Sequence, residues 1–170
     1  MTSARNSPEV KSAGCEAASK PEEFTTGDFR PLITDAQADA ESVDTVLLCS
    51  GRVTWDLMVE RAKREDAQRF AIARVEQLYP RPTEEIHDYL ASFPNLKAVR
   101  WVQDEPRNMG PWPHYALNVW PALDVSVEPV TRQASASPSV GTVKRHVEQQ
   151  KALIDRAFAP AGDPISQAKY

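Results

Sequence analysis

Short apolar runs recur along the middle of the chain and are separated by polar or amphipathic segments. Four runs have the length and the aliphatic content of buried strands: residues 45–50 (TVLLCS), 70–75 (FAIARV), 98–103 (AVRWVQ) and 125–130 (VSVEPV). The last run contains Pro129, which indicates a sheet edge or a strand end because proline cannot donate a ladder hydrogen bond.

Apolar residues at helical spacing predict a helix after each strand. The first three helices are expected at residues 53–65, from residues 82–83 onward, and at residues 114–120. The last is expected over residues 142–158, with one apolar stripe made of Val143, Val147, Ile154 and Phe158. Because strand and helix alternate four times, the sequence predicts a three-layer α/β fold, with a mostly parallel sheet and helices on both faces.

The two ends of the chain differ from this middle part. Residues 1–23 are expected to form a disordered tail, because their Ser, Ala, Glu and Lys content can bury too little apolar surface to offset ordering. We expect a linker at residues 24–43, the α/β domain at residues 44–158, and a flexible tail at residues 159–170. A mean hydropathy of −0.49 agrees with a chain that lies partly outside a core.

Composition narrows the function classes. The 170 residues carry a formal net charge of −4, so no basic excess is available for binding a nucleic-acid backbone. No apolar run approaches the roughly 20 residues that a membrane span needs. Cys15 and Cys49 form no CxxC pair, and we expect two free thiols in a reducing cytoplasm and no zinc site.

Polar loops follow the four strands, and ligands of open α/β sheets bind at the carboxyl ends of strands. Asp104 and Glu105 follow the third strand, where they suit either acid–base work or a salt bridge or helix cap with Arg107, and the sequence leaves both roles open. None of the loops carries a dinucleotide fingerprint, a phosphate-binding P-loop or a GxSxG nucleophile elbow.

The three histidines are spread along the chain. His87 is expected at the surface and His146 near the polar face of the last helix, whereas His114 suits either a cavity lining or simple packing. From the residues alone, no complete catalytic set emerges.

The same loops carry a family resemblance. The motifs VLLCSGRV (46–53), AIARVEQLYPRP (71–82), VRWVQDEPRNMGPW (99–112) and RQASASPSVGTVKRHVEQQ (132–150) resemble, in order and spacing, the C-terminal domain of the E1 component of 2-oxoglutarate dehydrogenase. The resemblance extends over about residues 18–158. It implies a C-terminal domain of the transketolase type.

The family resemblance also implies a function. That enzyme uses thiamine diphosphate and Mg²⁺ to decarboxylate 2-oxoglutarate in the tricarboxylic acid cycle, and it passes a succinyl group to the lipoyl arm of an E2 partner. The cofactor domains and catalytic histidines of the family precede this region. We therefore expect no catalytic, cofactor-binding or metal-binding residue in this chain, and no decarboxylase activity of the chain alone.

The expected role is structural. It would consist of dimer contacts and of shaping the entrance to an active site that is built elsewhere. The residues expected to act at that entrance or at an interface are Gln103, Asp104, Glu105, Asn108, Arg132 and Ser135. The expected partners are the remaining E1 domains or an E1 subunit, an E2 succinyltransferase indirectly, and a second copy of the chain, but neither nucleic acid nor a membrane.

One regulatory site of the family can be compared position by position. Actinobacterial members bind acetyl-CoA with residues that correspond here to Asp28, Pro31, Gln77, Glu84 and Glu85. Only Gln77 agrees, and two carboxylates replace the arginines that hold the ligand, so we expect this site to be absent. Two alternatives stay open for the chain as a whole: a free-standing interaction or ligand-sensing module, and a non-functional truncated remnant.

Overall fold

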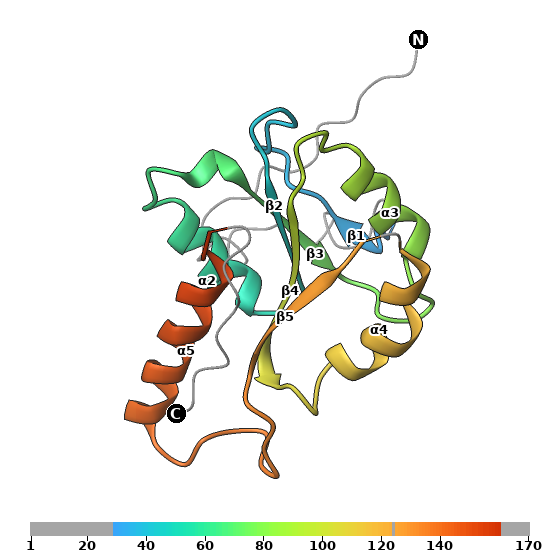
Figure 1. The fold of residues 1–170 in the computed structure, drawn as a ribbon. Helices are drawn as coiled ribbons and strands as arrows, with labels where there is room; N and C mark the ends of the chain where they lie inside the picture. The colour runs from blue at the N-terminus through green and yellow to red at the C-terminus, as the bar shows by residue number, and fades with distance from the viewer. Residues whose placement is uncertain (1–28, 124, 161–170) are drawn as a thin grey trace, which may run out of the picture.

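A computed structural model describes residues 29–123 and 125–160, and these residues form one sheet with helices packed on it (Figure 1). The five strands lie in the order β1-β3-β2-β4-β5. Four of them are parallel, and β1 pairs antiparallel with β3 at one edge. The strands are β1 (Leu32–Ile33), β2 (Thr45–Cys49), β3 (Phe70–Val75), β4 (Ala98–Pro106) and β5 (Val127–Arg132).

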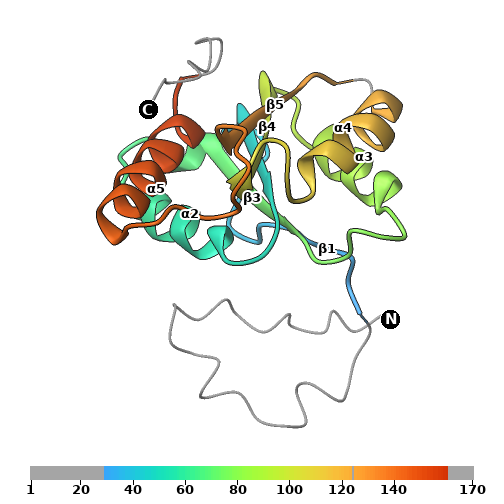
Figure 2. The same ribbon diagram turned by 90° about the horizontal axis from the view of Figure 1, so that it is seen from below.

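The helices form two layers, one on each face of the sheet. Figure 2 shows α2 (Val53–Arg61) and α5 (Val143–Ala157) on one side, and α3 (Thr83–Ala91) and α4 (Trp112–Asn118) on the other. Two short 3₁₀ turns, η2 (Ala67–Arg69) and η3 (Trp120–Ala122), complete the elements. The predicted three-layer α/β fold is confirmed. None of the described helices is long and apolar enough to cross a membrane.

Each face of the sheet has its own hydrophobic core because side chains alternate along a strand. On β2, Val46 and Leu48 pack in the core under α3 and α4, while Leu47 and Cys49 pack in the core under α2 and α5. All five residues of β2 are buried, as expected for a central parallel strand.

Three aromatic side chains pack together in the core under α3 and α4. Trp101 is fully buried on β4 and stacks on Tyr115 of α4, with ring centroids 5.0 Å apart. The ring centroid of Trp120 lies 5.6 Å from that of Trp101, and Trp120 completes the cluster.

Strand positions follow the prediction closely. β3 has the predicted bounds, β4 continues three residues further to Pro106, and β5 is displaced by two residues toward the C-terminus. Pro129 lies within β5, an edge strand, where a missing backbone donor is tolerated.

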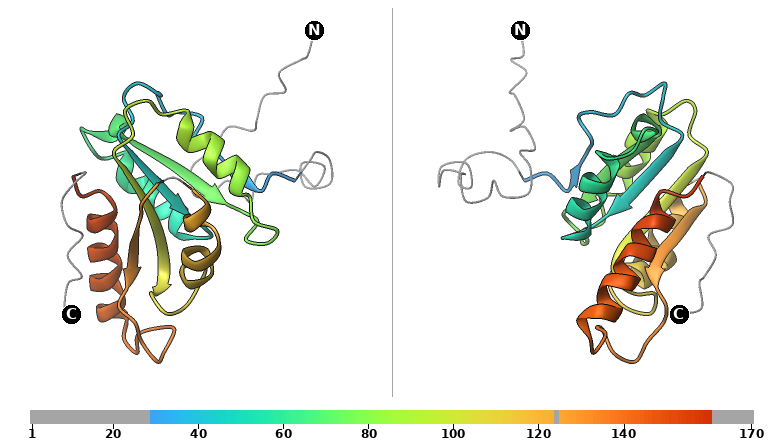
Figure 3. Two further views of the ribbon diagram at one scale, coloured as in Figure 1. Left: turned by 45° about the vertical axis from the view of Figure 1, so that its right-hand side comes forward. Right: turned by 90° about the vertical axis from the view of Figure 1, so that its left-hand side faces the viewer.

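The predicted buried stripe of the last helix is wrong in its first half. Ile154 and Phe158 are buried, but Val143 is 80% exposed and Val147 59% exposed. The buried residues of α5 begin at Gln149, and Figure 3 shows the first turns of the helix extending past the ends of β4 and β5. A helical repeat identifies a face, but it does not indicate where the sheet beneath that face ends.

The segment expected to be a linker contributes to the fold. Leu32 is buried and pairs with Val75, and the Asp35 carboxylate forms an ion pair with Arg61 of α2 and accepts a hydrogen bond from the Ile72 amide of β3 (3.1 Å). This carboxylate therefore occupies part of the β3 edge that the two-residue strand β1 leaves uncovered. The expected tail at residues 1–23 and most of the expected C-terminal tail lie outside the described residues.

A buried arginine holds the end of α5. Arg100 is fully buried on β4, and its guanidinium donates to the backbone carbonyls of Ala157 (3.1 Å), Ala159 (2.6 Å) and Pro160 (3.1 Å). Its Nε also donates to the Glu128 carboxylate of β5 (3.2 Å). The carbonyls at the end of a helix have no partners within the helix, and a cation there also opposes the negative end of the helix dipole.

We expect Arg100→Met to lower the free energy of unfolding by about 3 kcal/mol, because it leaves buried carbonyls and one carboxylate without their donor. Urea denaturation followed by tryptophan fluorescence measures the change. Lys63→Met is the matched control, because that side chain is 65% exposed, and it should change stability by less than about 0.5 kcal/mol. Equal stability of the two variants would contradict this account of α5.

Candidate functional site

The loops after β4 and β5 are joined at the carboxyl edge of the sheet. Asn108 donates its Nδ2 to the carbonyl of Ser135 (2.9 Å), and the Ser135 amide donates back to Asn108 Oδ1 (3.0 Å). The amide of Arg107 also donates to the carbonyl of Arg132 (3.0 Å). Asn108, Arg132 and Ser135, which lie far apart in the sequence, are therefore brought together.

A polar network centred on Gln150 of α5 connects three further elements. Its Nε2 donates to Asp104 Oδ1 of β4 (2.7 Å) and to Asp56 Oδ2 of α2 (2.9 Å). Its Oε1 accepts a hydrogen bond from Arg132 of β5 (2.8 Å). Both hydrogens of the amide and its oxygen are thus used, and the two carboxylates share one donor nitrogen.

Arg132 and the start of α2 extend this network at both ends. Arg132 is 7% exposed, and its guanidinium lies 3.3 Å from Nδ1 of His146. At the other end, Arg52 forms an ion pair with Asp56 across one turn of α2 (3.3 Å). We call Asp56, Asp104, Arg132, His146 and Gln150 the edge network.

Gln103 has a separate role beneath the loop after β4. It is 1% exposed, and its Oε1 accepts hydrogen bonds from the indole of Trp101 and from the amide of Trp112, both at 2.9 Å. Its Nε2 lies within hydrogen-bonding distance of two carbonyls at the end of β4, those of Glu105 and Pro106, and of the loop carbonyl of Met109, which is the closest (2.7 Å). One buried side chain therefore fixes the whole connection from β4 to α4.

Gly110 closes the same loop. Its φ of +65° lies in the left-handed region that side chains disfavour. A Cβ atom there would lie 3.0 Å from Oε2 of Glu105 and 3.1 Å from Nε2 of Gln103. The backbone must therefore approach these side chains closely.

The two acidic residues after the third strand have different surroundings. Asp104 is half-buried and accepts from Gln150, whereas Glu105 is exposed above Gly110. Of the two roles left open by the sequence, the structure shows no salt bridge from Asp104 or Glu105 to Arg107, which all lie in the described part of the chain. Asp104 instead accepts a hydrogen bond from α5, and the residue that caps α4 is Pro111. Asp104 is therefore part of the packing between β4 and α5.

Gln77, the one matching position of the acetyl-CoA comparison, lies after β3, which β2 separates from β4 in the sheet. Its side-chain Nε2 donates to the carbonyl of Pro80 (2.9 Å), and its backbone amide donates to the carbonyl of Pro31 (3.2 Å). Glu84 and Glu85 are exposed in the first turn of α3. Asp28 lies outside the described residues.

Comparison with known proteins decides the family. The sequence profile described as "2-oxoglutarate dehydrogenase C-terminal" matches residues 18–158. The chain belongs to this family. It is 38% identical over 148 residues to the 2-oxoglutarate dehydrogenase E1 component of Azotobacter vinelandii, a match that covers 84% of this chain and 16% of the relative.

Two other relatives give the same result. The E1 component of Cupriavidus necator is 40% identical over 149 residues, which are 85% of this chain and 15% of the relative. The E1/E2 component of Corynebacterium glutamicum is 40% identical over 147 residues, which are 84% of this chain and 12% of the relative. The chain thus spans less than a fifth of the length of these relatives.

The cysteine and histidine side chains of this E1 C-terminal domain have different surroundings in the described part of the chain. Cys49 is buried between Thr54 and the carbonyl of Ala73, and burial raises the pKa of its thiol to about 12. A neutral, buried thiol is a poor nucleophile. His87 and His114 are exposed, and His146 lies beside Arg132.

Three members of the edge network, Asp56, His146 and Gln150, were not among the site residues predicted from the sequence. Asp56 and Gln150 are ordinary polar residues within predicted helices. Gln150 ends the family motif at residues 132–150, but nothing in that motif singles it out. One available signal was Asp56 in the first turn of the helix after β2, which by topology starts at the same edge as Asp104. Gln150 could be found only from the packing of α5 on the sheet.

We expect Gln103→Leu to lower the free energy of unfolding by about 2–3 kcal/mol, because the indole of Trp101 and the amide of Trp112 lose their buried acceptor. Guanidinium denaturation measures the loss. Gln68→Leu, at an exposed position, is the matched control and should stay within about 0.5 kcal/mol of the wild type. A loss no greater than that of the control would rule out the organising role of Gln103.

Proposed function

We propose that this chain acts as the C-terminal domain of a 2-oxoglutarate dehydrogenase E1 component, and that its role there is structural. It supplies contacts to the other E1 domains and to a second copy, and it shapes the approach to an active site formed elsewhere. The observation that supports this best is the edge network, because Gln150 hydrogen-bonds α5 to side chains of α2, β4 and β5.

The same observation favours a structural role over bond-making for the residues of this edge. A general acid or base needs an atom that is free to exchange a proton with a substrate. Asp104 and Asp56 both accept from Gln150, and Arg132 donates to the same amide. Gln103 and Asn108 are likewise bonded to loop backbone. These residues therefore serve to hold α5 and the loops after β4 and β5 in place.

The family implies thiamine diphosphate, which is held through Mg²⁺. Magnesium sites use carboxylates whose oxygens are free to face the ion. At the edge, one oxygen of each of Asp56 and Asp104 accepts from Nε2 of Gln150, and the cationic Arg132 contacts the same amide. A divalent cation there would have to displace Gln150 and would be repelled by Arg132, which argues against this set as the holder of the cofactor. We propose that the cofactor is bound by other E1 domains, and that the chain works in the cytoplasm with those domains and, indirectly, with an E2 succinyltransferase.

Co-expression with the thiamine-binding domains of a related E1 tests the proposal. We expect the full chain to co-purify with those domains in stoichiometric amounts and to raise their turnover of 2-oxoglutarate, because a missing domain is restored. The thiamine-binding domains alone are the control. If the chain neither co-purifies nor changes turnover, the subunit role is contradicted, and the free-standing module or the remnant becomes the better explanation.

We further propose that the chain lacks the acetyl-CoA site. The exposed Glu84 and Glu85 place two negative charges where an anionic ligand would need cations. Titration calorimetry with acetyl-CoA should give no saturable heat up to millimolar ligand. The variant Glu84→Arg/Glu85→Arg removes the repulsion and is the matched comparison. Micromolar binding by the wild-type chain would contradict the proposal.

A further inference from the structure

The first two turns of α5 carry an apolar face that the described chain does not cover. Val143 and Val147 are 80% and 59% exposed, yet they lie on the same helical stripe as the buried Ile154 and Phe158. Positions separated by four and seven residues fall on one side of a helix. The stripe that packs on the sheet therefore continues, uncovered, past the end of the sheet.

This projecting half is held in place by polar contacts. Thr142 caps the helix by accepting from the Arg145 amide (3.4 Å), although this bond is long. Arg132 contacts His146 and Gln150 from β5, and Gln150 is bonded in turn to Asp104 of β4. The edge network thus lies where the helix leaves the sheet. The two valines are presented by an anchored helix.

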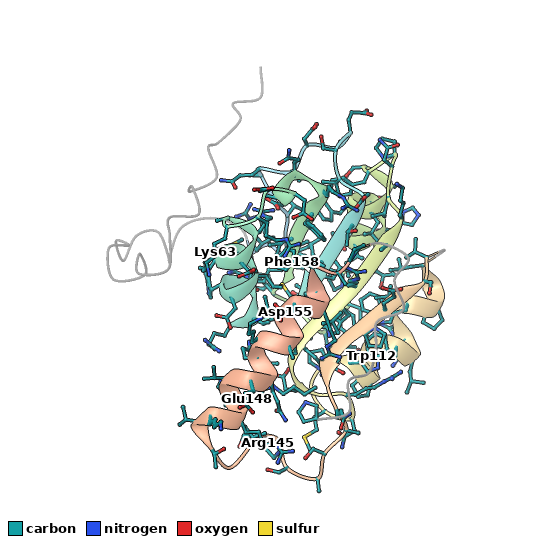
Figure 4. All side chains as sticks on the ribbon, turned by 60° about the vertical axis from the view of Figure 1, so that its left-hand side comes forward. Lys63, Trp112, Arg145, Glu148, Asp155 and Phe158 are labelled. Carbon is teal, nitrogen blue, oxygen red and sulfur yellow. The ribbon has the colours of Figure 1, made fainter. Side chains whose placement is uncertain are left out.

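The charges around the stripe favour an acidic partner. The first turn of α5 has no acidic residue, and it carries Lys144 and Arg145, both exposed. Positive charges near a helix N-terminus are disfavoured by the helix dipole, and carboxylates from outside would relieve this. Figure 4 shows Arg145 and Glu148 on the projecting turns, with Phe158 at the packed end of the helix. Glu148 is the one acidic residue of these two turns.

We propose that Val143 and Val147 dock on the upstream part of a 2-oxoglutarate dehydrogenase E1 chain, at an apolar depression flanked by carboxylates that face Lys144 and Arg145. The inference rests on the proposed function. The family match runs to residue 158 and so includes all of α5. The matched region is only 12–16% of the relatives, so in each relative most of the chain lies outside this domain and is available to cover the stripe.

The test measures binding of the full chain to a purified E1 protein that lacks this domain. Val143→Asp/Val147→Asp should weaken binding about tenfold or more, since two apolar contacts are replaced by carboxylates facing an acidic surface. Lys144→Glu/Arg145→Glu should also weaken it, and wild-type binding should fall with added salt. All four positions are exposed, so the circular dichroism and the unfolding midpoint of both variants should stay at their wild-type values.

Leu117→Asp is the matched control, because Leu117 is 78% exposed on α4, on the opposite face of the sheet. It should bind as the wild type does. Equal binding by Val143→Asp/Val147→Asp and the wild type would overturn the inference and leave the proposed function intact, as would an equal loss from Leu117→Asp. Absence of any wild-type binding would instead count against the proposed function and the inference together.

Two other occupants are distinguished in the same experiment. If a second copy covers the stripe, sedimentation of the chain alone will show a dimer that Val147→Asp dissociates. If residues 161–170 cover it, a chain ending at Pro160 will show faster amide exchange in the first turns of α5 than the full chain. Either result would overturn the assignment to the upstream E1 chain.

Discussion

The buried guanidinium of Arg100 determines where the last helix can lie. It is placed by the central part of β4, and it donates to carbonyls at and beyond the C-terminal end of α5. An arginine that is 0% exposed must have its donors satisfied, because leaving a buried charge unpaired is costly. This requirement fixes one end of α5, and the position of Gln150 along the helix follows from it.

Once α5 is placed, the polar side chains at the carboxyl edge of the sheet are arranged around Gln150. Gln150 lies where one amide can bond α2, β4 and β5 at once. Asn108 and Ser135 link the loops above these strands, and Gln103 holds the β4–α4 loop from below. In many α/β proteins this edge binds ligands. Here its polar groups hold the loops and the helix to one another, which suits a domain that supports a larger assembly.

The exposed part of the molecule fits the same view. The domain matches less than a fifth of the length of its relatives, so most of each relative lies outside it. Two valines on a capped and anchored helix are then easier to understand as part of an interface than as surface residues without a role. Their neighbours Lys144 and Arg145 make this surface positively charged.

The sequence by itself determined the α/β class, the positions of the central strands and the family. Periodicity and the loop motifs are local properties, so they can be read without coordinates. Tertiary structure decided what the pattern could not. It placed Asp35 on the edge of β3, joined Gln150 to Asp56 and Asp104, and left Val143 and Val147 uncovered. The physical reason is that hydrogen bonding and burial depend on which elements are neighbours, and residues 46 to 94 positions apart become neighbours only when the sheet and α5 pack together.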